Sequence, residues 1–195
     1  IISSDKIKGI KVVLYFFTIG LAFLFIEIAF IQKFTQILHH PVYSIAVTLT
    51  AFLVFSGLGS LLTARLLQYY SIEQIIVSVA TGISALCLFY LFSLGTIFTY
   101  LAVAPIGFKA FLMSLLIAPL AILMGMPFPL ALTSLARHAN YYIPWAWGIN
   151  GCASVISAVL ATVFAIHFGF SVVILIAVFL YITIVITFPK PTSPD

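Results

Sequence analysis

The chain of 195 residues is too apolar to be a water-soluble protein. Hydrophobic residues make up 64% of it and charged residues 6%, against roughly a quarter charged in ordinary soluble domains. A single core could not bury this much apolar surface, so the composition predicts an integral membrane protein. Eight Lys and Arg against four acids give a net charge of +4. These cations form no run that could hold a nucleic-acid backbone, and we interpret their excess as a topology signal.

The apolar residues fall into six segments, each close to the roughly 20 residues that cross a bilayer. Strand-like alternation is absent. We therefore expect an all-α integral membrane protein, a bundle of about six transmembrane helices that forms one domain over residues 12–188. A polar hinge at 32–41 separates the first two segments. In chain order the expected spans are 12–31, 42–67, 75–103, 111–135, 144–167 and 172–188.

The cations predict that both ends of the chain are cytoplasmic. In this N-in/C-in topology residues 1–11 are a cytoplasmic lead-in and residues 189–195 a cytoplasmic tail, expected to be disordered. The cytoplasmic side then carries Lys6, Lys8, Lys11, Arg65, Arg137 and Lys190, and the outside carries Lys33 and Lys109. An aromatic belt is expected at the cytoplasmic interface from Tyr15, Tyr69, Tyr70, Tyr141, Tyr142, Trp145 and Trp147.

The fourth span contains a predicted helix break at Gly125, Pro127 and Pro129. Each proline removes a backbone donor, so the carbonyls of Leu123 and Gly125 are expected to lose their helical partners. The span should bend or unwind there, with its free backbone groups facing protein or a cavity. Pro144, in contrast, is expected in the first turn of the fifth span, where a helix tolerates proline.

Small residues predict where helices approach closely. We expect four packing glycines: Gly57 and Gly59 in the second span, Gly148 and Gly151 in the fifth. Two faces with a small residue at every fourth position are also expected to pack. These faces are Ser56, Ser60 and Ala64, and Ala153, Ser157, Ala161 and Ala165.

A candidate intramembrane polar site comprises Glu27, Asn150, His39 and His40. Glu27 is the one acid within a span, expected four residues from the outer end of its helix, and burial against protein avoids the cost of exposing it to lipid. It is either a proton or cation site, or a buried carboxyl bonded to a neighbouring span. Asn150 is either part of a site or an interhelical hydrogen bond. The histidines either approach Glu27 or form an interfacial turn.

The residue pattern predicts no metal site and no cofactor. Cys87 and Cys152 both lie in apolar spans and read as small packing residues. They therefore indicate neither a disulfide nor a zinc site.

Five sequence motifs together resemble the membrane region of the bacterial spermidine synthase-like multi-pass membrane proteins. They are FIEIAFIQKF (25–34), HHPVYS (39–44), FSGLGSLL (55–62), GMPFPLAL (125–132) and PWAWGINGCASV (144–155). In that family transmembrane helices accompany a cytoplasmic domain similar to aminopropyltransferases and S-adenosylmethionine-dependent methyltransferases. The chain departs from the pattern at His39, where the family is expected to favour glycine.

The resemblance implies a location in the bacterial inner membrane and a transferase domain elsewhere, fused to this chain or carried by a partner subunit. It assigns no catalytic residue here, since the chain has neither a Gly-rich nucleotide loop nor an acidic polyamine-binding loop. We expect a piece of something longer, which anchors or partners a catalytic or redox complex and contacts lipid and other membrane subunits. The alternatives are half of a major-facilitator-like transporter that uses Glu27, and a structural, lipid-binding subunit.

Overall fold

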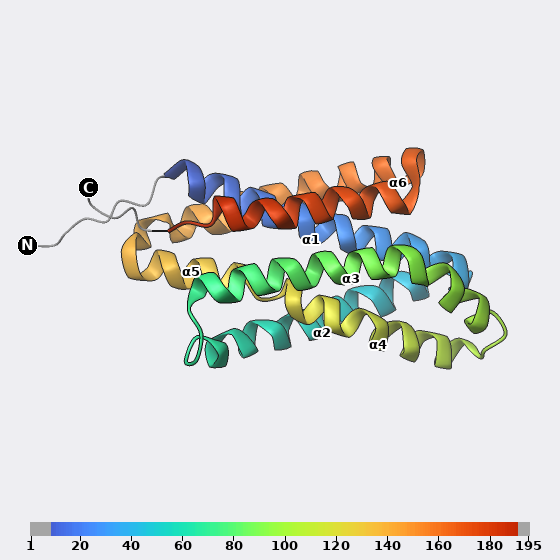
Figure 1. Cartoon of the computed structure of the whole chain (residues 1–195). Helices are drawn as coiled ribbons and strands as arrows, with labels where there is room; N and C mark the ends of the chain where they lie inside the picture. The colour runs from blue at the N-terminus through green and yellow to red at the C-terminus, as the bar shows by residue number, and fades with distance from the viewer. Residues whose placement is uncertain (1–8, 191–195) are drawn as a thin grey trace, which may run out of the picture.

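The computed structural model describes residues 9–190, and all the regular secondary structure in this part of the chain is helical (Figure 1). Lys6, Lys8 and the tail residues 191–195 lie outside the described residues. The helices are α1 (Gly9–Leu38), α2 (Pro41–Leu66), α3 (Ile72–Leu101), α4 (Ile106–Met124), α5 (Pro127–His138), a 3₁₀ turn η1 (Asn140–Tyr142) and α6 (Ile143–Thr187).

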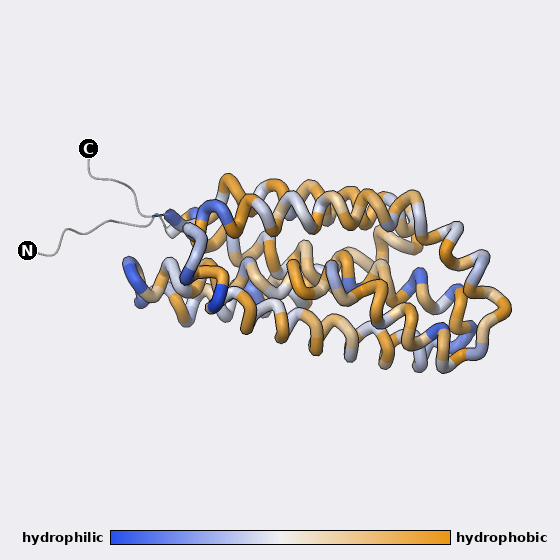
Figure 2. Tube along the Cα trace, turned by 60° about the horizontal axis from the view of Figure 1, so that its bottom comes forward, coloured by the Kyte–Doolittle hydropathy of each residue, from blue (hydrophilic) through white to orange (hydrophobic). Residues whose placement is uncertain are grey.

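Five helical stretches within the described residues are long and apolar enough to cross a membrane. They are α1, α2, α3, α4 with α5, and η1 with α6. Figure 2 shows that hydrophilic positions are concentrated towards the two ends of the bundle, with a mostly hydrophobic middle. Large apolar side chains also point outwards, Leu61, Phe92 and Ile186 among them. An apolar exterior between polar ends is compatible with a helical membrane protein.

Gly169 divides α6 into two arms. Its backbone has φ 80° and ψ 174°, a conformation that glycine adopts without the steric cost of a Cβ. The arms fold back on each other and both run beside α1 (Figure 1). Ser157 of the first arm donates a hydrogen bond to the Leu21 carbonyl over 2.7 Å.

The second arm returns along α1 in the opposite direction. Near its end Phe188 packs edge-on against Tyr15, with ring centroids 5.3 Å apart. The last helix therefore finishes at the end of the bundle where α1 begins (Figure 1). We call this the terminal end, which also holds the α2–α3 connection and η1. The distal end holds the α1–α2 turn, the α3–α4 turn and Gly169.

The helix bounds correct two expectations. The polar hinge at 32–41 is wrong, because α1 continues to Leu38. Phe34, Ile37 and Leu38 are buried and prolong its inward apolar stripe. His39 then ends the helix in the left-handed region, with φ 55°.

Helix α4 begins at Ile106 rather than at residue 111, and therefore includes Lys109. The Lys109 side chain is buried, and its Nζ donates to the Ala102 carbonyl over 2.9 Å. Its aliphatic stem thus lies along apolar surface while the amine binds the end of α3.

Tyr15 faces the protein interior and not the outer surface of the bundle. It is fully buried, and its hydroxyl donates to the Pro127 carbonyl over 2.9 Å. The hydroxyl thus finds its partner in protein rather than in headgroups. The other belt residues at the terminal end, such as Tyr69, Tyr141 and Trp145, are exposed.

Candidate functional site

The chain is interrupted between α4 and α5, where Gly125 and the two prolines occur. Helix α4 ends at Met124 and α5 begins at Pro127. The expectation of two free carbonyls needs correction, because the N–H of Met126 donates to the Leu123 carbonyl over 3.2 Å. This bond joins residues three apart, as in a 3₁₀ turn, and it replaces the donor that Pro127 lacks. The Gly125 carbonyl accepts no hydrogen bond from the described residues.

A cavity of about 570 Å³ lies beside this interruption, between α1, α2, α5 and α6. Its volume is within the range of small-molecule sites, roughly 300–1,000 Å³. Most of its wall is apolar, and Trp147 and Phe128 form an aromatic pair in it with centroids 4.7 Å apart. None of the lining residues is charged, and the hydroxyl- and amide-bearing ones are Ser56, Ser60, Asn150, Ser154 and Tyr181.

The cavity brings together residues that the sequence analysis treated separately. Asn150 from α6 lines it beside Gly125, Pro127 and Pro129 of the helix break, and Gly57 of α2 lines it too. These residues span almost 100 positions of sequence. Sequence spacing therefore carries no signal of their proximity, which depends on how α2, α5 and α6 pack.

Asn150 has a side chain that is free to bind an occupant of the cavity. Its backbone carbonyl accepts from Ser154 over 2.8 Å, but its side-chain amide forms no hydrogen bond within residues 9–190. The interhelical hydrogen bond considered for it is thus not formed there. Gly20 permits the close approach, because a Cβ at that position would lie 2.9 Å from the Asn150 side-chain oxygen. Nothing in the sequence around Gly20 indicates this close contact.

Glu27 lies deep in the bundle and not near the outer end of its helix. Eleven residues separate it from Leu38, or roughly 16 Å at 1.5 Å per residue. The side chain is 5% exposed and so points into the protein. It forms no hydrogen bond or ion pair with any residue that the structure describes.

The two histidines lie far from Glu27. His39 and His40 are exposed in the α1–α2 turn at the distal end, and the His40 ring packs edge-on against Tyr43 at 5.7 Å. Lys33 also turns away, since its Nζ lies 5.7 Å from the centroid of the Phe170 ring. The structure therefore separates the four predicted polar residues into three places.

One of the four predicted packing glycines makes a close contact. A Cβ on Gly59 would overlap the carbonyl of Ile122 in α4, whereas no atom of a neighbouring element lies within 4 Å of the Cβ position at Gly57, Gly148 or Gly151. Within residues 9–190 these three glycines therefore form no close helix contact, because their helix faces point to open space or to a cavity. Gly125, predicted as part of the break, is a second contact glycine and touches the Ser56 backbone.

The two faces of small residues also differ in their environment. Ala153, Ser157, Ala161 and Ala165 are all buried, and this side of α6 packs against α1. Ser60 and Ala64 of α2 are exposed instead. The α2 face therefore contacts the α4–α5 connection at Ser56 only, and at Ser60 and Ala64 it is exposed.

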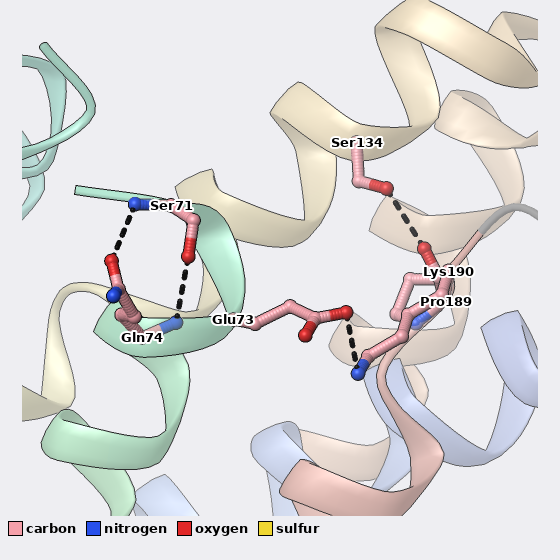
Figure 3. Close-up of polar contacts among 6 residues, drawn as sticks. All are labelled: Ser71, Glu73, Gln74, Ser134, Pro189 and Lys190. Atoms are coloured by element: carbon pink, nitrogen blue, oxygen red, sulfur yellow. Dashed lines mark hydrogen bonds and ion pairs between the residues drawn. The ribbon is translucent and has the colours of Figure 1, made fainter.

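A polar cluster joins three elements at the terminal end (Figure 3). The Lys190 amine lies 2.7 Å from the Glu73 carboxylate of α3, and Ser134 of α5 donates to the Pro189 carbonyl over 2.8 Å. Ser71 and Gln74 form a capping box at the start of α3. This cluster was missed because its members are about 60 residues apart in sequence.

We expect the two connections of this cluster to differ in strength. Glu73→Gln should change the free energy of unfolding by less than about 1 kcal/mol, because both partners are exposed. Ser134→Ala should cost about 1–3 kcal/mol, since the Ser134 side chain is buried and its loss leaves the Pro189 carbonyl unpaired. Thermal unfolding of both variants in one detergent should show the larger loss of stability in Ser134→Ala. A larger loss of stability in Glu73→Gln would contradict the prediction.

The described fold is that of an all-helical protein with spans of membrane length and a lateral cavity at a broken helix. Residues 9–190 contain no group of three or more metal-ligating side chains. Comparison of the chain with protein-family models, curated proteins and solved structures finds no match.

Proposed function

We propose that the chain is the membrane domain of a spermidine synthase-like protein of the bacterial inner membrane. In this role it crosses the bilayer six times and anchors or partners a catalytic or redox complex, with no catalytic site of its own. The family assignment rests on the five motifs quoted above. The observation that carries the anchoring role is the arrangement of the terminal end, where α1 begins and the last helix finishes (Figure 1).

Six crossings follow if α4 with α5 forms one span and the two arms of α6 form two. The break at Gly169 supports this division, because an unbroken helix of 45 residues would be roughly 68 Å long. That length is about twice the hydrocarbon thickness of roughly 30 Å. An even number of crossings leaves both flanks of the domain on one side, where either can connect to a soluble partner.

The charge distribution supports a cytoplasmic terminal end. Lys11, Arg65, Arg137 and Lys190 lie there, against Lys33 and Lys109 at the distal end. Cytoplasmic flanks of membrane spans are enriched in Lys and Arg. The contacts of Lys190 and Pro189 (Figure 3) hold the end of the last helix against α3 and α5. A soluble partner connected there would thus have a fixed position relative to the bundle.

We expect single cysteines to report this topology. Tyr70→Cys, Tyr141→Cys and Lys190→Cys should react with a membrane-impermeant thiol reagent only from the cytoplasmic side. Val103→Cys and Phe168→Cys should react only from outside. All five positions except Lys190 are more than half exposed. The background is Cys87→Ser with Cys152→Ser, because both native cysteines are free.

The decisive pair is Tyr141 and Lys190. With two α6 arms both react from the same side, and Phe168→Cys reacts from the other. Reaction of Tyr141→Cys and Lys190→Cys from opposite faces would contradict six crossings. For the anchoring role, native mass spectrometry of the membrane-extracted assembly should give a mass well above the 21.3 kDa of this chain. A lone 21.3 kDa species would contradict that role.

One observation favours transport as a second candidate function. Glu27 is a buried acid that no described residue neutralises, and intramembrane acids mark proton or ion pathways in transporters. The broken α4–α5 helix beside a cavity is also a transporter feature. In this alternative the chain is half of a major-facilitator-like bundle, and Glu27→Gln abolishes proton-coupled uptake while leaving the fold intact. Uptake that persists in Glu27→Gln would contradict it.

The cavity favours a third candidate, a structural subunit that binds lipid. Its wall is mainly apolar, with Asn150, three serines and Tyr181 as polar groups. Ser154→Leu would fill the cavity from α6 and should reduce the amount of lipid that co-purifies with the protein. Retention of the same lipid by Ser154→Leu and by the native protein would contradict this role.

A further inference from the structure

Helices α1 and α2 pack antiparallel in a register that can be read from two contacts. Ser44 of α2 donates a hydrogen bond to the Ile31 carbonyl of α1 over 2.8 Å. Two turns along, the rings of Phe23 and Phe52 lie with centroids 6.0 Å apart. These contacts define the facing stripes of the two helices.

Glu27 and Thr48 lie at the same level on these stripes. Glu27 is four residues from both Ile31 and Phe23, and Thr48 is four residues from both Ser44 and Phe52. Side chains four apart on a helix share a face. The contacts on either side therefore set Glu27 and Thr48 opposite each other.

Neither side chain has a hydrogen-bond partner among the described residues, and Glu27 is 5% exposed. Thr48 is fully buried, and its hydroxyl forms no hydrogen bond. Thr63 on the same helix shows the usual alternative, donating to the Gly59 carbonyl one turn back over 3.1 Å. A buried hydroxyl without a partner destabilises the folded state, and a buried carboxyl without a partner does so too. A hydrogen bond between the two groups would satisfy both.

No cation within the described residues neutralises Glu27. On α1, Lys33 faces the rings of Phe98 and Phe170. Arg65 lies at the terminal end of α2, and Lys109 of α4 is bonded to the Ala102 carbonyl at the distal end. The groups of the other helices are neutral or remote: Cys87, Tyr90 bonded to the Leu116 carbonyl, Tyr181, and His167 near the Gly169 turn.

We propose that Glu27 and Thr48 form an intramembrane proton-binding site. The structure contains no hydrogen bond between them; in the proposed site the Glu27 carboxyl, once protonated, forms one with the Thr48 hydroxyl across the α1–α2 interface. This proposal rests on the membrane domain proposed above and identifies the group and partner that its transporter alternative would use. A neutral carboxyl bonded to a hydroxyl also satisfies both groups without burying a charge.

The cavity beside the helix break offers the path for exchange. Leu24, which lines the cavity, precedes Glu27 by one helical turn. Glu27 itself does not line the cavity, so on release the carboxyl O–H bond breaks and the proton passes to a water molecule that enters from the cavity, giving hydronium. The carboxylate that remains accepts a hydrogen bond from the Thr48 hydroxyl. Uptake reverses these steps.

Infrared spectroscopy of the full chain in lipid bilayers tests the pair at neutral pH. A protonated buried carboxyl gives a C=O stretching band separate from that of carboxylates, and the band should be lost in Glu27→Gln. In Thr48→Val it should shift to higher frequency, because the C=O bond strengthens when its hydrogen bond is removed. Thr48→Ser retains a hydroxyl and should restore the native frequency.

Thr63→Val is the matched control, since Thr63 is buried on the same helix but its hydroxyl is bonded to Gly59. It should leave the band unchanged. The proposal is overturned if the native protein has no such band, if the band survives Glu27→Gln, or if Thr48→Val and Thr63→Val have the same effect. A carboxylate band that responds to Na⁺ in place of the protonated band would also overturn it, in favour of a cation. Failure here leaves the cysteine topology intact, and the two proposals are tested separately.

Discussion

Gly59→Ala is expected to destabilise the protein strongly, whereas Gly57→Ala two residues away is not. A methyl group on Gly59 would overlap the carbonyl of Ile122, which is backbone and cannot rotate aside. Helices α2 and α4 would have to separate along their contact. Such overpacking costs about 1–3 kcal/mol, occasionally more. Close backbone approach at small residues is also a main source of helix association in lipid.

Gly57→Ala is the matched control because the Cβ position there meets nothing within 4 Å. Both substitutions gain the same helix propensity, about 1 kcal/mol, so their difference isolates the α2–α4 contact. Thermal unfolding in a fixed detergent should give a lower midpoint for Gly59→Ala and an equal or higher one for Gly57→Ala. Equal midpoints for the two variants would show that the helices do not meet at Gly59.

Phe30→Ala is expected to be the most damaging truncation of a single side chain. The ring is fully buried and packs edge-on against four others, from α1, α2, α3 and the second arm of α6. Their centroids lie 5.5–6.0 Å away: Phe34, Phe52, Tyr90 and Phe170. Removing the ring leaves a cavity where these elements meet, at a cost of about 3–5 kcal/mol.

Phe92→Ala serves as the control for Phe30→Ala. It makes the same chemical change at a side chain that is 80% exposed and faces outwards. The loss of packing in Phe30→Ala should lower the unfolding midpoint well below that of Phe92→Ala. Phe30→Leu should recover part of the loss, because it refills some of the volume. A similar effect of both alanine substitutions would mean that the aromatic cluster contributes little to stability.

Much of the local structure could be predicted from composition and proline chemistry. The expected connection between residues 167 and 172 contains the Gly169 turn, and the helix is interrupted at Gly125 and Pro127. Both features depend on backbone rules that act within a few residues: a missing donor at proline and a positive φ at glycine. The sequence predicts that the first helix ends at residue 31, because residues 32–36 are mostly polar. The helix continues to Leu38, since Phe34, Ile37 and Leu38 pack into the core.

The candidate site depended on contacts that sequence spacing cannot show. Gly57 and Gly59 look alike in the sequence, but one lines the cavity and the other touches Ile122. A residue moves by about 100° around a helix at each step, so two glycines two apart face nearly opposite directions. Which direction meets a neighbour depends on where α4 packs.

The sequence by itself determined that this is an all-helical chain with spans of membrane length. Its apolar runs are about 20 residues long, and in lipid only a helix or a closed barrel satisfies all backbone N–H and C=O groups. It also singled out Glu27 as an acid that must be covered by protein. Only the tertiary structure decided which residues lie at its level. The antiparallel register of α1 and α2 sets Thr48, and not the histidines, at the level of Glu27. The register is fixed by contacts between the helices, here Ser44 with Ile31 and Phe52 with Phe23. A hydropathy pattern cannot predict such contacts.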